Sequence, residues 1–348
     1  MLLVTGGSGF IGSHIVDALA AAGRSVRILD HHAPTAPVPG GVDVQLGDVR
    51  DPATVATALD GVTAVCHQAA MVGLGVDLDY IADYVSHNDL GTAVLLKAMA
   101  ARVRAGHGPS RLVLASSMVV YGEGRYRCAE HGLVAPGPRE TDDLEGGRFE
   151  PPCPVCGAPL TPEPVPETAP ADPRNVYAAT KLQQEHLATA FSRETGLPVT
   201  ALRYHNVYGP RMPRDTPYAG VASLFSSELA AGRPPRVFED GGQLRDFVHV
   251  RDISHANVLA LTAEEPVPGA FNVCSGTPRS VLDMARALHA AAATGTPEPV
   301  IAGGYRLGDV RHVFADATRA REVLGFTARE PFTEGMAELF AGETRPAG

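Results

Sequence analysis

Apolar and polar positions alternate along the first half of the chain in a regular succession of short and long segments. Apolar runs of strand length occur at 2–6, 26–29, 42–47, 63–70 and 111–117. Between them, residues 11–22, 52–59 and about 80–104 carry apolar side chains at helical spacing. Strands that alternate with helices in this way indicate a parallel sheet covered by helices on both faces. The pattern predicts a Rossmann-type, doubly wound α/β fold.

The second half repeats this pattern once and then departs from it. A helix is expected to begin near Tyr177, and 196–209 is expected to contain the next strand. Shorter helices and turns predict a smaller, C-terminal substrate lobe formed by 207–246 and 276–348. The sheet domain is then 1–206 together with 247–275. Residues 122–174 are rich in proline, glycine and charge and lack periodicity, which predicts an inserted Cys-rich loop.

Composition narrows the class of protein. The 348 residues are 45% hydrophobic and 20% charged, as is usual for globular proteins, and the net charge is −10. This charge argues against a nucleic-acid partner, because binding to phosphate backbones depends on clustered cations. The apolar runs are too short for a membrane helix. The N-terminal segment lacks a basic region and is broken by glycines, so it is expected to be a buried strand and not a signal peptide. We expect a cytoplasmic protein with reduced cysteines and no membrane partner.

Glycines at the first turn indicate a dinucleotide site. Gly6, Gly9 and Gly12 come directly after a strand and open a helix, a context in which backbone N–H groups approach a pyrophosphate. Asp30 ends the second strand, where a carboxylate binds ribose hydroxyls and repels a 2′-phosphate, so NAD is favoured over NADP. Asp48 ends the third strand and is placed either to contact adenine or to cap the next helix.

Two residues one helical turn apart suggest the chemistry. Tyr177 and Lys181 share a helix face, and Lys181 is one of only two lysines, with Lys97, in a chain that uses arginine elsewhere. A fixed ammonium, with a nicotinamide cation, is expected to lower the pKa of the phenol from its usual value near 10. Lysine is also a compact donor that can hold ribose hydroxyls. Ser117 follows the fifth strand and could hydrogen-bond the substrate oxygen that Tyr177 deprotonates.

With these residues the sequence resembles the extended short-chain dehydrogenase/reductase superfamily, and within it the nucleotide-sugar epimerases and dehydratases. The matching pieces cover nearly the whole chain in the right order: TGGSGFIGSH (5–14), Asp30, GDVRD (47–51), HQAA (67–70), Asn88, SSMVVYG (116–122), YAATK (177–181), RYHNVYGP (203–210), DGGQLRDFVHVRD (240–252), FNVCSG (271–276) and RLGDVRH (306–312).

The resemblance implies a role for each matching position. The pyrophosphate would be held by Gly6, Gly9, Phe10, Ile11 and Gly12, the ribose by Asp30, and adenine by Asp48 and Val49. Gln68, Ala69 and Ala70 would line the cofactor, with Asn88 beneath them and His205 near the nicotinamide. Ser117, Tyr177 and Lys181 would be catalytic. Asn206, Arg245 and Arg306 would bind the diphosphate side of a nucleotide sugar, with Arg311 as a further candidate. A homodimer through the helices near 80–104 and 177–194 is also implied.

The residues after Ser117 bear on the reaction. A sugar 4,6-dehydratase of this group carries an Asp-Glu pair there, whereas this chain has Met118 and Val119, which cannot transfer a proton. The prediction is therefore a 4-epimerase, which oxidises C4 to a ketone and reduces it from the other face. Segments 69–77, 116–126 and 204–223 are similar to those of dTDP-L-rhamnose 4-epimerases. Met71, Met118 and Val119 would suit a 6-deoxy sugar better than a uronate, unless they are simply packed at the edge of the sheet.

Other functions stay open. An oxidoreductase, or an epimerase acting at another carbon, would use the same machinery. A non-catalytic NAD-sensing protein is a further alternative, but proteins of that kind typically lose the Tyr/Lys pair that this chain retains.

Four residues of the insert have the spacing of metal ligands. Cys128-x-x-His131 and Cys153-x-x-Cys156 each offer two tetrahedral ligands, so a structural Zn²⁺ is predicted, with free thiols or a redox pair as alternatives. The interval between Ser117 and Tyr177 is much longer than the resemblance leads us to expect, which is why 122–174 is taken as an insert. Cys66 and Cys274 lie in apolar runs and are expected in the core.

Overall fold

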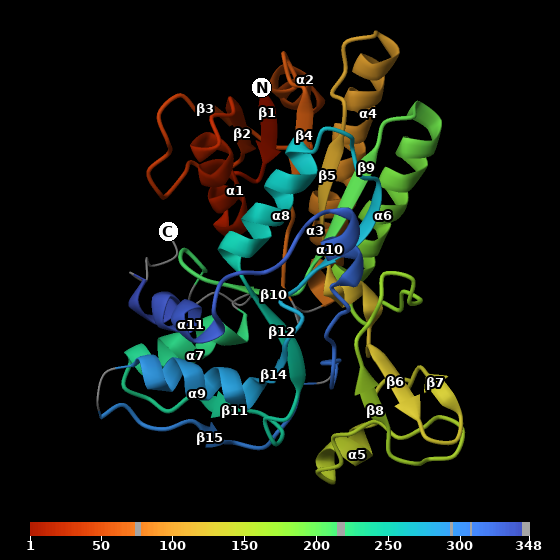
Figure 1. The fold of residues 1–348 in the computed structure, drawn as a ribbon, viewed down its shortest axis with the longest axis vertical. Coiled ribbons are helices and arrows are strands. Elements are labelled where there is room, and N and C mark those ends of the chain that lie inside the picture. The colour runs from red at the N-terminus through yellow and green to blue at the C-terminus, as the bar shows by residue number, and fades with distance from the viewer. Residues whose placement is uncertain (74–77, 214–219, 293–294, 307, 343–348) are drawn as a thin grey trace.

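The structure is a computed structural model that describes residues 1–73, 78–213, 220–292, 295–306 and 308–342. A seven-stranded parallel sheet forms its centre, in the order β13-β9-β5-β4-β1-β2-β3 (Figure 1). Its strands are β1 (Leu2–Thr5), β2 (Val26–Asp30), β3 (Asp43–Leu46), β4 (Ala64–His67), β5 (Leu112–Ser117), β9 (Val199–Tyr204) and β13 (Gly269–Val273). The strand order reverses beside β1, and this is the point where doubly wound sheets bind ligands. The predicted fold class is confirmed.

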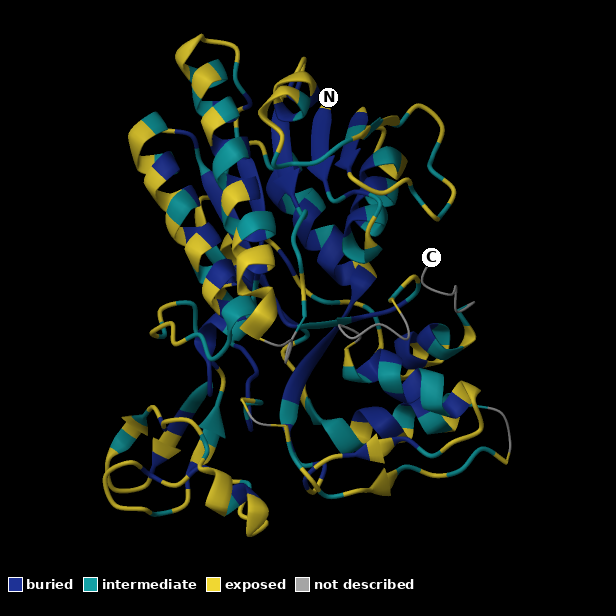
Figure 2. Cartoon of the chain, turned by 180° about the vertical axis from the view of Figure 1, so that it is seen from behind, coloured by how far each residue is buried: buried dark blue, intermediate teal, exposed yellow. Residues whose placement is uncertain are grey.

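Helices cover both faces of the sheet. On one face lie α1 (Phe10–Ala21) and α8 (Val250–Thr262), and on the other α2 (Pro52–Ala58), α4 (Gly91–Arg104) and α6 (Val176–Thr195). Leu2 and Val4 of β1 point into the first core and Leu3 into the second, because successive side chains of a strand alternate between faces. Both cores are apolar, which explains the continuous hydrophobic runs in the sequence. Figure 2 shows the buried strands between more exposed helices.

The segment before α4 is less regular than its sequence suggests. It begins with η1 (Leu78–Tyr80) and α3 (Ile81–Tyr84), continues through the π-helical turn η2 (Val85–Leu90), and only then becomes α4. The extra residue of such a turn shifts the face that each side chain occupies. Asn88 is thereby buried against the sheet edge.

A smaller lobe lies below the carboxyl edge of the sheet (Figure 1). Its helices are α7 (Val221–Ala230), α9 (Val281–Ala291) and α11 (Phe332–Ala341), and its strands are β10 (Asn206–Tyr208), β11 (Arg236–Val237), β12 (Leu244–His249), β14 (Pro278–Ser280) and β15 (Val300–Ile301). Phe225, Met284 and Met336 belong to its own apolar core. In contrast, Ala320 of α10 (Thr318–Val323), with Leu324 and Phe326, packs into the sheet core, although the prediction placed these residues in the smaller lobe. The exact boundaries of the two domains stay a prediction.

The segment 122–174 is more ordered than a loop. The strands β6 (Arg125–Cys128), β7 (Gly132–Val134) and β8 (Thr161–Glu163) form an antiparallel sheet in the order β7-β6-β8, with the short helix α5 (Thr141–Glu145) beside it. We call residues 123–163 the hairpin module. Three- or four-residue strands show no periodicity of their own, so the sequence pattern could not reveal them.

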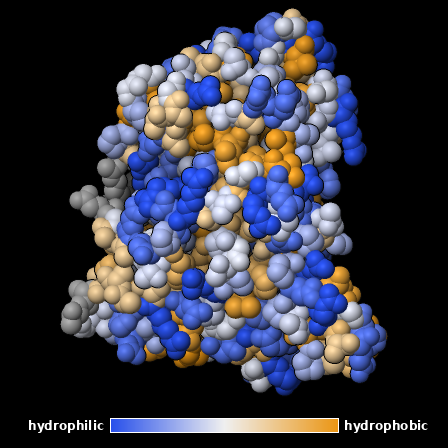
Figure 3. All heavy atoms as spheres, viewed as in Figure 1, coloured by the Kyte–Doolittle hydropathy of each residue, from blue (hydrophilic) through white to orange (hydrophobic). Residues whose placement is uncertain are grey.

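The surface agrees with a globular protein. Figure 3 shows mostly hydrophilic residues, with a hydrophobic area in the upper half of the view, where the sheet domain lies in Figure 1. Within the described residues, no helix has the length and the apolar character needed to cross a membrane. Cys66 and Cys274 are buried, as predicted.

Candidate active site

The carboxyl ends of the parallel strands bring most of the predicted site residues to one edge. Gly6 follows β1, Asp30 ends β2, Asp48 follows β3, Gln68 follows β4 and Ser117 ends β5. Parallel strands end at the same edge of a sheet, so loops far apart in sequence meet there. The edge faces the smaller lobe, and the site therefore lies between the two.

The first turn forms a close-fitting cradle. Gly6 has a φ of +69°, and a Cβ there would lie 2.7 Å from the backbone nitrogen of Ala69. A Cβ on Gly12 would lie 2.0 Å from the carbonyl oxygen of Gly6. Gly9 is the N-cap of α1, which then begins with Phe10 and Ile11. The first turn of α1 carries no acidic residue, so its N–H groups and positive end can receive a phosphate.

Asp30 and Asp48 take different places. Asp30 is 8% exposed and accepts hydrogen bonds from the backbone N–H groups of Ser8 (2.9 Å) and His32 (3.0 Å), which ties the end of β2 to the glycine turn. Asp48 pairs with Arg50 at 2.5 Å, and this hydrogen bond lowers the pKa of Asp48 to about 2. Asp51, and not Asp48, caps α2, so the capping alternative for Asp48 is wrong.

The loop after β4 is held in place by hydrogen bonds from side chains. The Asn88 amide accepts a hydrogen bond from the backbone N–H of Met71 (2.7 Å) and donates to the carbonyl of Met71 (3.0 Å) and to the hydroxyl of Thr180 (2.9 Å). Gln68 donates to the hydroxyl of Tyr204 at 3.0 Å. Asn88 thus fixes the course of residues 69–71, including Ala69 and Ala70, along the edge, consistent with its predicted place beneath the cofactor.

The three predicted catalytic residues come together. Asn175 caps α6 by accepting the N–H of Ala178 at 2.9 Å, and this starts the helix just before Tyr177. The hydroxyl of Ser117 hydrogen-bonds to Tyr177. Lys181, one turn further on, is only 3% exposed and donates from Nζ to the carbonyl of Ala115 in β5 at 3.1 Å.

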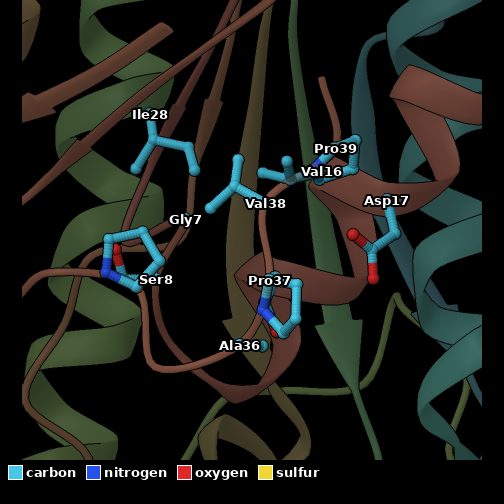
Figure 4. Close-up of a pocket in the computed structure, with 11 residues that line it drawn as sticks. Gly7, Ser8, Val16, Asp17, Ile28, Ala36, Pro37, Val38 and Pro39 are labelled. Atoms are coloured by element: carbon cyan, nitrogen blue, oxygen red, sulfur yellow. The ribbon is translucent and has the colours of Figure 1, made fainter. Parts of the chain in front are cut away.

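A pocket beside the turn is not part of this arrangement. Pro37, Val38 and Pro39 lie over Gly7 and Ser8 and over α1 (Figure 4). Gly7 and Ser8 of the glycine turn line it, but none of the predicted site residues does.

Comparison with known proteins agrees with this geometry. The model of the NAD dependent epimerase/dehydratase family matches residues 2–143 and 153–274. The chain belongs to this family. It is 35% identical to the dTDP-L-rhamnose 4-epimerase of Burkholderia thailandensis, over 97% of this chain and 93% of that protein. It is 28% identical to the UDP-glucose 4-epimerase of Corynebacterium glutamicum, over 94% and 90%.

Solved structures show the same fold. The UDP-glucose 4-epimerase of Thermus thermophilus in complex with NAD superposes with a TM-score of 0.76 at 31% identity, covering 97% of both chains. The UDP-glucose 4-epimerase of Thermotoga maritima with UDP-glucose gives 0.78 at 28% identity, again over 97% of both.

Burial changes the pKa values of Tyr177 and Lys181. It raises the pKa of Tyr177 to about 12, although the hydrogen bond from Ser117 acts in the opposite direction. Burial also lowers the pKa of Lys181 to about 8. The predicted lowering of the pKa of Tyr177 depends on the ammonium acting together with a nicotinamide cation, so it stays a prediction for the protein with NAD bound.

Two carboxylates near Lys181 escaped the sequence reasoning. Glu185 and Asp89 both act to raise the pKa of Lys181 against the effect of burial. Glu185 accepts hydrogen bonds from Ser116 and from Arg203, the latter at 2.7 Å. The sequence could have revealed Glu185, since it follows Lys181 by four residues and therefore lies on the same helix face. No pattern in the sequence pointed to Asp89, which the π-turn places here.

Residues on the substrate side are also well buried. Burial lowers the pKa of His205 to about 3, so this imidazole is neutral. The Oδ1 atom of Asn206 is buried and has no hydrogen-bond partner within the described residues. Met118 is 6% exposed and lies in an apolar cluster with Val120.

The three predicted diphosphate-binding arginines differ in their surroundings. Arg306 is exposed and stacks over the ring of Phe238 at 5.5 Å. Arg245 donates to the carbonyls of Val310 (2.6 Å) and Arg311 (2.8 Å). The Arg311 side chain is 3% exposed and pairs with the carboxylates of Glu150, Glu239 and Asp240 at 2.7 to 2.8 Å. Three anions already surround it, so it is less suited than Arg306 to contact a phosphate.

The cysteine and histidine side chains of the hairpin module converge. The ligand atoms of Cys128, His131, Cys153 and Cys156 all lie within 4.8 Å of one another. Sγ of Cys128 is 3.7 Å from Sγ of Cys156 and 3.5 Å from Nδ1 of His131. A disulfide would need about 2.05 Å, whereas sulfurs around a tetrahedral zinc lie about 3.8 Å apart.

The two lysines allow a direct test of the buried cation. With ¹³C-labelled lysine, the NMR spectrum contains signals from Lys181 and from exposed Lys97, which serves as the internal reference. We expect the Lys181 signal to titrate near pH 8, as burial dictates. Removing a carboxylate removes a stabilising partner of the ammonium, so the titration should move to lower pH in Glu185→Gln and in the milder variant Asp89→Asn.

The control is Glu194→Gln, an exposed residue on the same helix. It should leave the Lys181 titration in place. Titration of Lys181 together with Lys97 in the wild-type protein, or no shift in both carboxylate variants, would contradict the description of this site.

Proposed function

We propose that the chain is an NAD-dependent nucleotide-sugar 4-epimerase. The observation that carries the proposal is the meeting of Ser117, Tyr177 and Lys181 beside a glycine turn that fits a pyrophosphate, in a chain 35% identical to a dTDP-L-rhamnose 4-epimerase. Bound NAD would lie along the carboxyl edge and would accept the C4 hydride and return it. The residues that would hold it are Gly6, Gly9, Phe10, Ile11, Gly12, Asp30, Asp48, Val49, Gln68, Ala69, Ala70, Asn88, Tyr177, Lys181 and His205.

The side chains of this site would move one proton. Tyr177 accepts the proton of the sugar's 4-hydroxyl while the C4–H bond breaks, and Ser117 donates a hydrogen bond to the same oxygen. C4 becomes a ketone. Tyr177 gives the proton back when hydride is added to the opposite face, so that substrate and product differ only in configuration. Since the pKa of Tyr177 is about 12 in the protein alone, this role needs an added positive charge near the phenol.

Sugar dehydration is disfavoured by the residues after Ser117. Neither Met118 nor Val119 carries a group that can protonate a leaving hydroxyl, and Met118 is packed in the core. The substrate we propose is dTDP-L-rhamnose or a related dTDP- or UDP-sugar. Asn206, Arg245 and Arg306 would face its diphosphate, with Arg311 behind them. A net oxidoreductase or an epimerase at another carbon is the alternative, and it would release NADH or change C3 or C5.

A homodimer is proposed on the helical side of the sheet domain. Leu78, Tyr80, Ile81, Val85 and Leu90 are 42–69% exposed on the segment that precedes α4 and packs beside α6. A row of exposed apolar side chains is typical of an interface. We also propose that the protein is cytoplasmic, in keeping with cysteines that form no disulfide.

We further propose that Cys128, His131, Cys153 and Cys156 hold a structural Zn²⁺. Three thiolates and one imidazole fill a tetrahedral shell and leave no open position for water, so the metal would stabilise the fold and take no part in catalysis. Gly132 and Gly157, with φ of +68° and +73°, let the chain turn sharply after His131 and after Cys156.

Replacing the proposed base tests the activity. Tyr177→Phe should reduce turnover by about 10²- to 10⁴-fold, the range typical of general acid–base groups, because no proton acceptor remains. The amount of bound NAD should not change. The assay uses a panel of dTDP-, UDP- and GDP-sugars with product stereochemistry measured by NMR. Undiminished turnover in the variant, with NAD still bound, would rule out Tyr177 as the base.

Metal analysis tests the zinc site. Elemental analysis of the purified protein should give about one zinc per chain, since four ligands form one tetrahedral site. Cys153→Ser should lose the metal, whereas Cys274→Ser, at a buried cysteine outside the cluster, should keep it. A wild-type protein with no zinc, and with three titratable thiols or a disulfide in the module, would overturn the proposal.

A further inference from the structure

Two of the metal-ligand residues, Cys128 and Cys153, stand at the ends of two chain segments that both contact the same short stretch of the smaller lobe. Residues 311–313 run beside β12 and carry Arg311 and His312. The first segment, residues 123–128, ends at Cys128. The second, residues 150–153, ends at Cys153. Each segment places side chains against residues 311–312 just before it reaches the metal ligands.

The first segment contacts the backbone of this stretch. Glu123 accepts the N–H of Arg311 at 3.2 Å, and the hydroxyl of Tyr126 accepts the N–H of His312 at 3.2 Å. Tyr126 is fully buried. A Cβ on Gly124 would lie 2.4 Å from the carbonyl of His312, so the two backbones touch here. Cys128 follows Tyr126 by two residues in the same strand.

The second segment contacts the side chains of this stretch through Glu150. Its carboxylate accepts a hydrogen bond from Nε of Arg311 at 2.8 Å and lies 2.9 Å from Nε2 of His312. Glu150 precedes Cys153 by three residues. Between the two, Pro152 forms a bridge with Pro159, and the N–H of Cys153 donates to the carbonyl of Ala158, so the position of Glu150 depends on how this turn is held.

On its other side the stretch positions a predicted substrate arginine. Arg245 of β12 donates to the carbonyls of Val310 and Arg311, and the N–H of Val313 donates to the carbonyl of Leu244. Nδ1 of His312 accepts the N–H of Leu244 at 3.0 Å. A shift of residues 310–313 would therefore move the guanidinium of Arg245.

A third contact joins the module to the same place. Arg139 donates to Glu239 at 2.8 Å, and Arg311 donates to the other oxygen of this carboxylate at 2.8 Å. Glu239 has a φ of 53°, in the left-handed region that favours glycine, and such a conformation persists only where its surroundings hold it. Of the two arginines that bind Glu239, Arg139 belongs to the hairpin module and Arg311 to the stretch that the module contacts.

The module has little else to hold it together. Its apolar core consists of Tyr126, Cys128, Cys153 and Leu160, with Val134 packed against them. A core this small does not fix a fold without a metal or another cross-link. The four ligands connect the segment of Tyr126 to the segment of Glu150.

We propose that metal binding in the hairpin module positions residues 310–313 and, through them, Arg245 for the diphosphate of the substrate. The inference rests on the proposed nucleotide-sugar function. The metal acts at a distance from the reacting atoms, so its removal weakens nucleotide binding and leaves NAD binding intact. Glu150 is a positioning residue in this chain of contacts.

The experiment is a double-mutant cycle with Cys153→Ser and Glu150→Gln. Zinc content, bound NAD, and the affinities for UDP and dTDP by titration calorimetry are measured for each protein. We expect Cys153→Ser to lose zinc, keep NAD, and bind the better nucleotide about 2- to 30-fold more weakly, the range that packed networks transmit. Glu150→Gln should keep zinc and show a loss of similar size. The double variant should be little worse than either, because both changes break the same connection.

The matched control is Glu140→Gln, which removes one charge from an exposed side chain of the same module. It should bind zinc and nucleotide like the wild type. Unchanged nucleotide affinity in Cys153→Ser, or fully additive losses in the double variant, would overturn the proposal. Failure of the wild-type protein to bind NAD or either nucleotide would instead count against the proposed function, since zinc content is measured independently of both.

Discussion

The site depends on keeping one ammonium group charged inside the protein. Lys181 is almost fully buried, and burial of an unpaired cation is so costly that the group tends to lose its proton. The carbonyl of Ala115 and the nearby carboxylates Glu185 and Asp89 offset part of this cost. With a pKa of about 8, Lys181 is still mostly protonated at neutral pH. Its charge lies one helical turn from Tyr177, at the carboxyl edge of the sheet, where the loops that follow the strands meet.

The surrounding network keeps these groups in place. Glu185 is held by Arg203 and by Ser116, the residue just before Ser117, so the carboxylate that supports Lys181 is tied to the strand that carries the proposed catalytic hydroxyl. Arg203 also donates to the hydroxyl of Tyr121 at 2.8 Å. Arginine suits this position because its planar guanidinium can donate to two partners in fixed directions. Lysine suits position 181 because it gives a compact charge whose pKa responds to its environment.

Much of the sheet domain could be predicted because its signals are local. Continuous apolar runs mark buried parallel strands, and the glycine turn and the Tyr/Lys spacing each fall within a dozen residues. The hairpin strands could not be found, since strands of three or four residues are too short to show any period. The ligand spacing within the same segment was found, because each pair of ligands is local.

Ion pairs between residues far apart in the sequence explain most other differences between the predicted site and the structure. The carboxylates around Arg311 come from positions 150, 239 and 240, and no sequence pattern connects them to it. The sequence led us to expect that the ammonium and a nicotinamide cation lower the pKa of Tyr177, but it could not show the depth of burial, which raises this pKa. The same limit applies to Met118, whose burial in an apolar cluster could not be seen in the sequence.

The phenol of Tyr177 becomes a usable base only when a second positive charge, besides that of Lys181, lies near it in the site. The most direct measurement is the titration of Tyr177 by NMR in protein with ¹³C-labelled tyrosine, with its signal among the nine tyrosines assigned through Tyr177→Phe. The protein is compared with NAD⁺ bound and after the cofactor is reduced to NADH, whose nicotinamide is neutral. The account predicts a pKa well below 12 with NAD⁺ and one close to 12 with NADH. Equal titration of Tyr177 in the two states would contradict it.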